Sequence, residues 1–364
     1  MDSSPLEGDD ASIYCIDDFD LNGGQSDPEP DSSSCTTNCS TETITGSVLD
    51  DFLTEVNGRL FPSDVNVAIS LPQDSAEIQR CVDHHRVFKM ILGSNYWGPA
   101  EQVLAPTPGT MDRKRVLDMV TAEGSWVQEM AEQFPHVDFL SVDNVPLTCH
   151  KPRANTLFEV YDLYNGIAAP DSSFDVVHMR QSTAHVRNSK DLIRDLHRVL
   201  KPGGLFLFSD TELDVYDGMD PSSPAGDKLP GLTAALQFVR QGLVQQGVNP
   251  YLWRDLSELL SPGSGLWASQ RGLDDHKLVG FRNIHSQAHL FPANTWPEDT
   301  QSKDLGRLAG DIWKGMWRSM EVPFQMYGMG EEAARQIIEG AINDIDRADV
   351  AVAVKYHTVY AFKI

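Results

Sequence analysis

The sequence is poor in cysteine, and its five cysteines form no recognisable metal-binding or disulfide framework. Two of them, Cys35 and Cys39, lie in a segment rich in serine and threonine that has no histidine nearby. We therefore expect free thiols in a reducing compartment, and we expect no metal site.

Long apolar stretches are lacking too. No run approaches the roughly 20 residues that a membrane-spanning helix needs, and the N-terminus carries no apolar region of the kind found in signal peptides. These features predict a cytoplasmic or nuclear protein that makes no contact with a membrane.

Basic residues are scarce near the N-terminus. Up to Ser75 the chain carries 16 acidic residues and one basic residue, Arg59, within a formal net charge of −24. This balance argues against direct binding of nucleic acid, which needs clustered lysine and arginine. Residues 1–73 also contain few aromatic residues, so they cannot bury enough apolar surface to offset the entropy of ordering. We expect a disordered acidic segment, which could serve as an arm for a protein partner.

One ordered domain is expected over residues 74–364. Asp74, followed three residues later by Glu77, is typical of a capping box, and the apolar spacing beyond it predicts a helix that ends at Gly93. Strands and helices then alternate. The expected strands are 116–119, 137–142, 156–161, 174–179 and 205–209, with helices at 125–134 and 189–200. This rhythm predicts an α/β fold with a doubly wound, mostly parallel sheet that has helices on both faces.

The pattern changes after Asp210. A loop rich in proline, glycine and serine precedes expected helices at 232–246, 251–260, 303–320 and 330–345, and expected strands at 283–291 and 351–363. Two stretches, 211–275 and 295–350, are expected to be insertions that cover the active face. They carry large aromatic residues, which either line a pocket for a planar acceptor or pack as core; these are Trp253, Trp267, Trp296, Trp313, Trp317, Phe324 and Tyr327.

The stretch 115–124 carries the strongest functional signal. An apolar strand ends in Asp118, and a short loop leads through Gly124 into a helix whose N-terminus can face a ligand. Ligands of such sheets bind beyond the carboxyl ends of the strands, and Asp143, Asp162 and Arg180 end the next strands. The spacing therefore predicts a nucleotide-type site at this edge of the sheet.

Three motifs together resemble class I S-adenosylmethionine-dependent methyltransferases. The first strand and its loop, 116–124, read V-L-D-M-V-T-A-E-G, where the family has V-L-D-x-G-x-G-x-G. Residues 173–180 resemble the family's fourth strand, and the Lys-Pro-Gly-Gly turn at 201–204 resembles the entry into the fifth. Residues 158–180 and the C-terminal segment 356–364 are most similar to the fungal LaeA-like methyltransferase-domain proteins, which are linked to secondary metabolism.

The resemblance implies a Rossmann-like methyltransferase fold whose seven-stranded sheet has an antiparallel last strand, and it implies S-adenosyl-L-methionine as the cofactor. Asp143 would accept hydrogen bonds from the ribose hydroxyls, Asp162 would bind the adenine amine, and Asp118 would act on the methionine end. The cofactor-binding set is expected to comprise Asp118, Val120, Ala122, Gly124, Asp143, Asn144, Asp162 and Arg180. His178 and His185 are the candidates for a general base, should one be needed.

Val120 and Ala122 stand where the family has glycine, which allows unusual backbone angles and a close approach to the ligand. An active methyltransferase with an adjusted loop is therefore one interpretation. A weak or inactive relative that acts as a regulatory scaffold is the other. An NAD-dependent oxidoreductase is disfavoured, because the loop lacks G-x-G-x-x-G. The residues leave the acceptor open between a small molecule and a protein.

Overall fold

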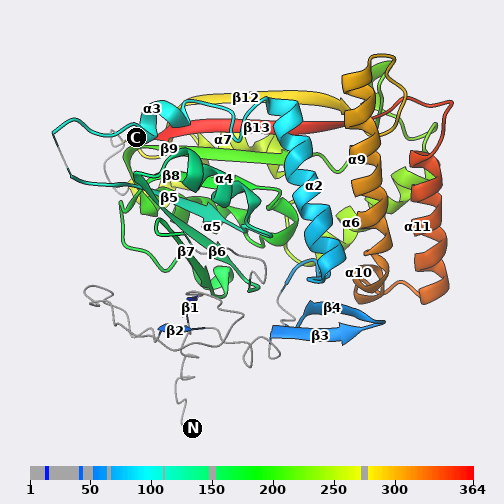
Figure 1. Cartoon of the computed structure of the whole chain (residues 1–364), viewed down its shortest axis with the longest axis horizontal. Helices are drawn as coiled ribbons and strands as arrows, with labels where there is room; N and C mark the ends of the chain where they lie inside the picture. The colour runs from blue at the N-terminus through cyan, green and yellow to red at the C-terminus, as the bar shows by residue number, and fades with distance from the viewer. Residues whose placement is uncertain are drawn as a thin grey trace, which may run out of the picture.

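The computed structural model describes residues 13–15, 41–43, 52–63, 67–109, 111–146, 153–271 and 278–364. Figure 1 shows a twisted sheet at one end of the molecule and a group of long helices at the other, with the helix α2 (Ser75–Leu92) between them. The C-terminal strand β13 (Val352–Lys363) runs through the length of the sheet and reaches the helical end.

The central sheet has the strand order β7-β6-β5-β8-β9-β13-β12. Its parallel strands are β5 (Lys114–Met119), β6 (Val137–Asp143), β7 (Thr156–Val160), β8 (Phe174–Arg180) and β9 (Leu200–Thr211). β13 pairs antiparallel with both β9 and β12 (Phe281–Pro292). These seven strands confirm the predicted doubly wound, mostly parallel sheet and its antiparallel last strand.

The sheet has eleven strands in all among the described residues, four more than predicted. β1 (Ile13–Cys15) and β2 (Thr41–Thr43) extend the edge beyond β7. The hairpin of β10 (Tyr216–Asp217) and β11 (Asp220–Pro224) pairs with the start of β13. Sequence reading treats this segment as a loop because of its prolines, which edge strands tolerate.

Helices cover both faces of the sheet. One face packs on α3 (Ala100–Leu104) and α4 (Ser125–Gln133), and the other on α5 (Ser189–Val199) and α7 (Leu252–Leu260). Adjacent residues of β5 illustrate the alternation, since Val116 belongs to the first core and Leu117 to the second. Burial on both faces explains the nearly continuous apolar sequence of these strands.

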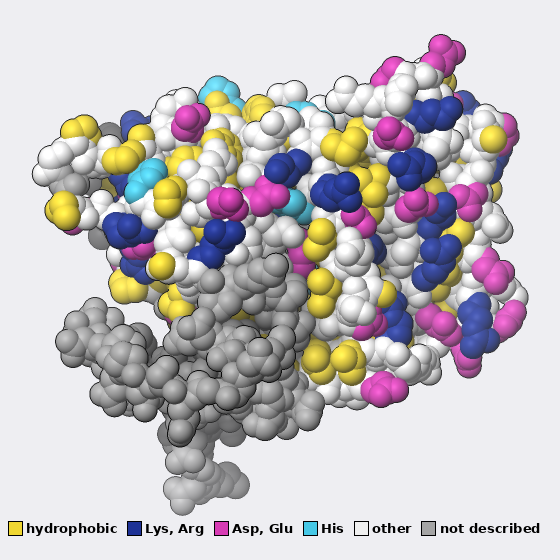
Figure 2. Space-filling view, viewed as in Figure 1, with side chains coloured by type: hydrophobic (Ala, Val, Ile, Leu, Met, Phe, Trp, Pro, Cys, Tyr) yellow, Lys and Arg dark blue, Asp and Glu magenta, His cyan; other side chains and the backbone are white. Residues whose placement is uncertain are grey.

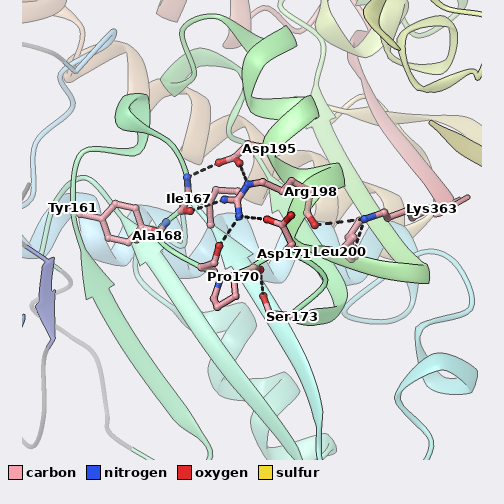
Figure 3. Close-up of polar contacts among 11 residues, drawn as sticks. Tyr161, Ile167, Ala168, Pro170, Asp171, Ser173, Asp195, Arg198, Leu200 and Lys363 are labelled. Carbon is pink, nitrogen blue, oxygen red and sulfur yellow. Dashed lines mark hydrogen bonds and ion pairs between the residues drawn. The ribbon is translucent and has the colours of Figure 1, made fainter. Parts of the chain in front are cut away.

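Arg198, near the end of α5, fixes the crossover between the end of β7 and β8 (Figure 3). Its guanidinium donates to the carbonyls of Ile167 and Ala169 and pairs with Asp171 and Asp195. Asp195 in turn accepts from the backbone N–H of Ile167 at 2.5 Å. One side chain thereby satisfies carbonyls of an irregular segment that no ladder would pair.

A third core joins the helical end to the sheet. It is built by α2, α6 (Pro230–Gln245), α9 (Thr300–Arg318), α10 (Glu321–Met326) and α11 (Glu331–Ile345) together with the start of β13. Short helical turns complete the chain; they are η1 (Leu163–Asn165), η2 (Thr183–His185), η3 (Gly265–Trp267) and α8 (Ala268–Arg271).

The helix α2 begins and ends where the sequence predicts. The side chain of Asp74 accepts from the backbone N–H of Glu77, and Gly93 closes the helix in the left-handed region at φ 70°. Glu77 uses its carboxylate differently from a capping box: it takes a bidentate ion pair from Arg80, with contacts of 2.9 and 2.6 Å. Both residues of this ion pair line the cavity described below.

Folded segments precede Asp74. β3 (Leu53–Val56) and β4 (Arg59–Pro62) form a hairpin across Asn57-Gly58, both of which have positive φ. Arg59 binds Asp74 and the hydroxyl of Ser319, which anchors the hairpin on the helical end. Residues 52–63 and 67–73 thus fold against the domain, within the segment that composition predicts to be disordered; most of residues 1–51 lie outside the described part.

Figure 2 shows acidic and basic side chains interspersed over the helical end rather than gathered by sign. Within the described part of the chain, no helix is both long enough and apolar enough to cross a bilayer.

Candidate active site

The loop after β5 adopts backbone angles that are strained for the residues it contains. Val120 has φ 55° and Ala122 has φ 54°, both in the left-handed region, and Gly124 has φ 79°. A β-branched residue in this region costs on the order of 1–3 kcal/mol. The loop therefore adopts backbone angles that glycine reaches without strain, at two positions where the family pattern has glycine.

Asp143 at the end of β6 holds this loop in place. Its Oδ2 accepts from the N–H of Ala122 at 3.0 Å, and its Oδ1 accepts from Val145 at 3.3 Å. The N–H of Val120 donates to the carbonyl of Val142 at 2.9 Å. Burial raises the pKa of Asp143 to about 6, against the lowering effect of these backbone donors. The strained loop is thus fastened to the neighbouring strand at two points.

Asp118 lies on the other side of the loop and is fully buried. Its Oδ1 accepts from Nδ1 of His178 at 2.7 Å, and its Oδ2 accepts from the hydroxyl of Thr121 at 2.6 Å. The His178 ring stacks on Trp126, with centroids 3.6 Å apart and planes 9° from parallel. Burial lowers the pKa of His178 in spite of the carboxylate. The first of the two predicted bases therefore orients Asp118.

Asp162 and Asn144 lie further along the same edge. Asp162 caps the η1 turn, accepting from the N–H of Tyr164 at 2.9 Å and from the amide of Asn165 at 3.2 Å. Asn144 follows Asp143 and has a buried Nδ2 without a protein partner among the described residues. An orphaned donor at this place is a feature that a ligand oxygen would satisfy.

A cavity of about 230 Å³ opens beside the loop. Six of the ten predicted site residues line it, and Gly124, Asp143, Asn144 and Asp162 do not. The six are Asp118, Val120, Ala122, His178, Arg180 and His185. The structure thus separates the prediction into a group on the cavity and a group along the β6 and β7 ends, with the loop between them.

Arg180 ends β8 and reaches toward α2. Its Nη1 donates to Nδ1 of His85 at 3.0 Å, and its guanidinium lies 5.4 Å above the centre of the Phe88 ring. His185, the second predicted base, lies on the η2 turn, where burial lowers its pKa to about 4. Near neutral pH both predicted bases are therefore uncharged.

Sequence reading missed several residues of the cavity. The helix α2 contributes Arg80, His84, His85 and Phe88, and β9 contributes Asp210. Burial raises the pKa of Asp210 to about 6, although it accepts from the N–H groups of Thr183 and Thr211. The polar residues on the otherwise apolar face of α2 were the available signal.

The aromatic residues of the two expected insertions divide between both interpretations. Trp253, Trp313 and Trp317 line the cavity, and the last two are also buried in the third core. Trp267 and Phe324 are fully buried away from the cavity, and Trp296 and Tyr327 do not line it either. Within these two insertions, α7 and α9 therefore supply the tryptophans that line the cavity.

The residues present fit an S-adenosylmethionine-type cofactor. The loop retains the glycine-like path that lets backbone approach a ligand, and α4 begins directly behind it. Asp143 still offers unused lone pairs, since an ionised carboxylate accepts at about four sites. The orphaned Asn144 amide lies next to it.

Comparison with known proteins identifies the family. The family described as "Methyltransferase domain" matches residues 96–308. Methyltransferase str3 of Strobilurus tenacellus is 27% identical over 154 residues, 42% of this chain and 53% of that protein. The secondary metabolism regulator laeA of Coprinopsis cinerea is 30% identical over 165 residues, 45% and 40% of the two chains. The chain thus matches about half or less of the length of these relatives.

Among solved structures, phosphoethanolamine N-methyltransferase 2 of Haemonchus contortus, in complex with S-adenosyl-L-methionine, is 14% identical, with a TM-score of 0.40. The match covers 87% of this chain and 72% of that one. The family match confirms the resemblance found in the sequence, and with it the class of cofactor that the fold serves. The chain belongs to the methyltransferase domain family of class I S-adenosylmethionine-dependent methyltransferases, and is similar to the fungal LaeA-type proteins.

Proposed function

We propose that the protein is an active methyltransferase that transfers a methyl group from S-adenosylmethionine to a small-molecule acceptor, in a pathway linked to secondary metabolism. The observation that carries this proposal is the loop at 119–124. Val120, which is β-branched, and Ala122 both adopt left-handed backbone angles, and strain of this kind is typical of functional sites. The cavity that starts at this loop supplies space for an acceptor.

The residues divide the work by position. Asp143, with the Asn144 amide beside it, would hold the ribose, Asp162 the adenine amine, and Asp118 with the loop backbone the methionine end. When bound, the cofactor supplies an electrophilic methyl group on a sulfonium. The chain then contributes proximity and orientation, which suffice for an acceptor that is already nucleophilic. His178 and His185 are not required as bases for such an acceptor.

Calorimetry and thermal shift with S-adenosylmethionine and S-adenosylhomocysteine test the proposal. We expect binding by the full chain and at least a tenfold loss in Asp143→Asn. The matched control is Asp138→Asn, on the same strand, whose carboxylate is half exposed and pairs with Arg113. Val120→Gly should bind more tightly, because it removes side-chain bulk from the loop.

If millimolar cofactor gives neither heat of binding nor a thermal shift, the proposed methyltransferase activity is refuted. That result would leave a regulatory scaffold, with the acidic N-terminal segment as an arm for a protein partner, in the cytoplasm or nucleus.

A further inference from the structure

Arg180 is set apart from the other charged residues of the cavity by its partners. Its described contacts are a neutral imidazole, His85, and the face of Phe88. Within the described chain no carboxylate lies within ion-pair distance of its guanidinium. It is also half-buried, at the end of a strand whose other residues are fully covered.

His85 does not supply the missing negative charge. Burial, aided by the charge of Arg180, lowers the pKa of His85 to about 4, so the ring is neutral near pH 7. Because a guanidinium can only donate, Nδ1 of the ring accepts from Arg180 and the proton of the neutral ring is on Nε2, which lies 3.2 Å from Oε1 of Glu129. The Glu129 carboxylate also binds Lys89, at 2.5 Å.

The cavity wall also carries the cation Arg80 and four carboxylates, Glu77, Asp118, Glu123 and Asp210. Arg80 is held by Glu77, and both side chains are buried. Asp118 is occupied by His178 and Thr121. The carboxylate of Asp210 accepts from two backbone N–H groups. A partly buried charge without a counter-ion is costly, and among the described residues no carboxylate lies within ion-pair distance of Arg180.

The rest of the wall is largely aromatic. Phe88, Trp126, Trp313 and Trp317 line it. The indole N–H groups of Trp253 and Trp317 are buried without a partner among the described residues, and so is Nε2 of His84. Flat aromatic surfaces make up much of the wall beside Arg180.

We propose that the methyl acceptor is a planar, apolar molecule with an anionic oxygen group, a carboxylate above all, which binds to Arg180. This inference rests on the proposed function, because only a methyltransferase has a methyl acceptor. The chemistry of the ligand is argued from the cavity. The flat rings suit a planar body, and a guanidinium takes a carboxylate by two parallel hydrogen bonds. The methionine end of the cofactor also carries a carboxylate, so the experiment must separate these two sources.

The experiment measures binding to the full chain in the absence of cofactor, using 1-naphthoate and its neutral analogue 1-naphthamide. Tryptophan fluorescence and calorimetry report occupancy, because tryptophans line the cavity. We expect naphthoate to bind at least tenfold more tightly than naphthamide. Arg180→Gln should abolish this difference, and Arg180→Lys should restore part of it. Arg335→Gln, which removes an exposed, ion-paired arginine on α11, should change nothing.

A second arm measures S-adenosylhomocysteine with the same variants. Affinity within threefold of the parent in Arg180→Gln supports an acceptor site. A loss of S-adenosylhomocysteine binding with unchanged naphthoate binding would assign Arg180 to the cofactor and overturn the proposal. Equal affinity for the acid and the amide in the parent protein would also overturn it, even if Arg180→Gln failed to fold. If the parent protein binds no cofactor but still prefers the acid to the amide, only the proposed function is refuted.

Discussion

Nδ1 of His178 lies 2.7 Å from Oδ1 of Asp118, across the neighbouring strands β8 and β5, and both side chains are buried. The strand register places these two residues directly opposite each other. The imidazole also stacks on the indole ring of Trp126. The pair therefore couples the first strand of the cofactor loop to the fourth strand and to α4.

The first prediction concerns this pair. His178→Phe retains a ring to stack on Trp126 but removes the donor to a buried carboxylate, so we expect a loss of about 2 kcal/mol in the free energy of unfolding. His178→Ala should lose more, because the stacking surface goes too. Urea unfolding measures both.

A double-mutant cycle with Asp118→Asn provides the control. If the hydrogen bond is the source of the loss, the two changes will be less than additive. Full additivity would show that His178 stabilises the protein by packing alone.

The second prediction concerns strain in the loop. Ala122 is exposed and has φ 54°. Ala122→Gly should therefore raise the free energy of unfolding by about 1 kcal/mol, because glycine adopts this region without a steric cost. Chemical unfolding at pH 7 checks the sign.

The control is the same substitution in a regular helix. Ala333 is exposed within α11, and Ala333→Gly should lower the free energy of unfolding by about 1 kcal/mol. Opposite signs at the two positions are expected. Destabilisation at both would mean that the loop does not store strain at residue 122.

The third prediction concerns pH. His197 is buried on α5 beside Trp267 and Phe281, and burial lowers its pKa to about 4, helped by the charge of Lys363. The unfolded histidine titrates near 6.5. Between these values the unfolded chain binds a proton that the folded chain does not, so stability falls as the pH falls from about 6.5 toward 4.

His197→Gln removes this titration. The variant should lose less stability than the parent between pH 7 and 4, by up to about 3 kcal/mol for a shift of this size. Unfolding free energies measured at intervals across this range provide the comparison. Parallel curves for the two proteins would contradict the assignment.

Local sequence patterns predicted the elements whose form depends on neighbouring residues. Asp74 and Gly93 marked the ends of α2, and the 116–124 stretch predicted the strand, loop and helix that the structure shows. Asn57-Gly58 is an equally local hairpin signal, but the prediction for residues 1–73 rested on composition and did not use it.

The cavity could not be read in the same way. Arg180 contacts His85, 95 residues earlier in the chain, and Trp126 stacks on His178, which lies on the third strand further along the chain. No spacing in the sequence encodes such pairs, because they depend on how α2 and α4 pack across the sheet. The prediction therefore found the strand ends and missed the residues that face them from α2.

The last prediction concerns α9, the helix that contributes Trp313 and Trp317 to the cavity wall. Two glycines of α9 differ in what a side chain would meet. A Cβ at Gly306 would lie 2.1 Å from the backbone oxygen of Asn294, which cannot move without displacing the segment after β12. A Cβ at Gly315 would lie 3.4 Å from Cδ of Arg80, an ordinary contact with a flexible side chain.

Gly306→Ala should therefore destabilise the protein by about 1–3 kcal/mol or more, because 1–3 kcal/mol is the usual cost of overpacking. Gly315→Ala should be neutral or stabilise it by up to about 1 kcal/mol, through the higher helix propensity of alanine. Thermal and urea unfolding of the two variants, made in the same helix, measure the difference. Equal effects would show that the close approach of α9 to Asn294 does not constrain the helix that positions Trp313 and Trp317.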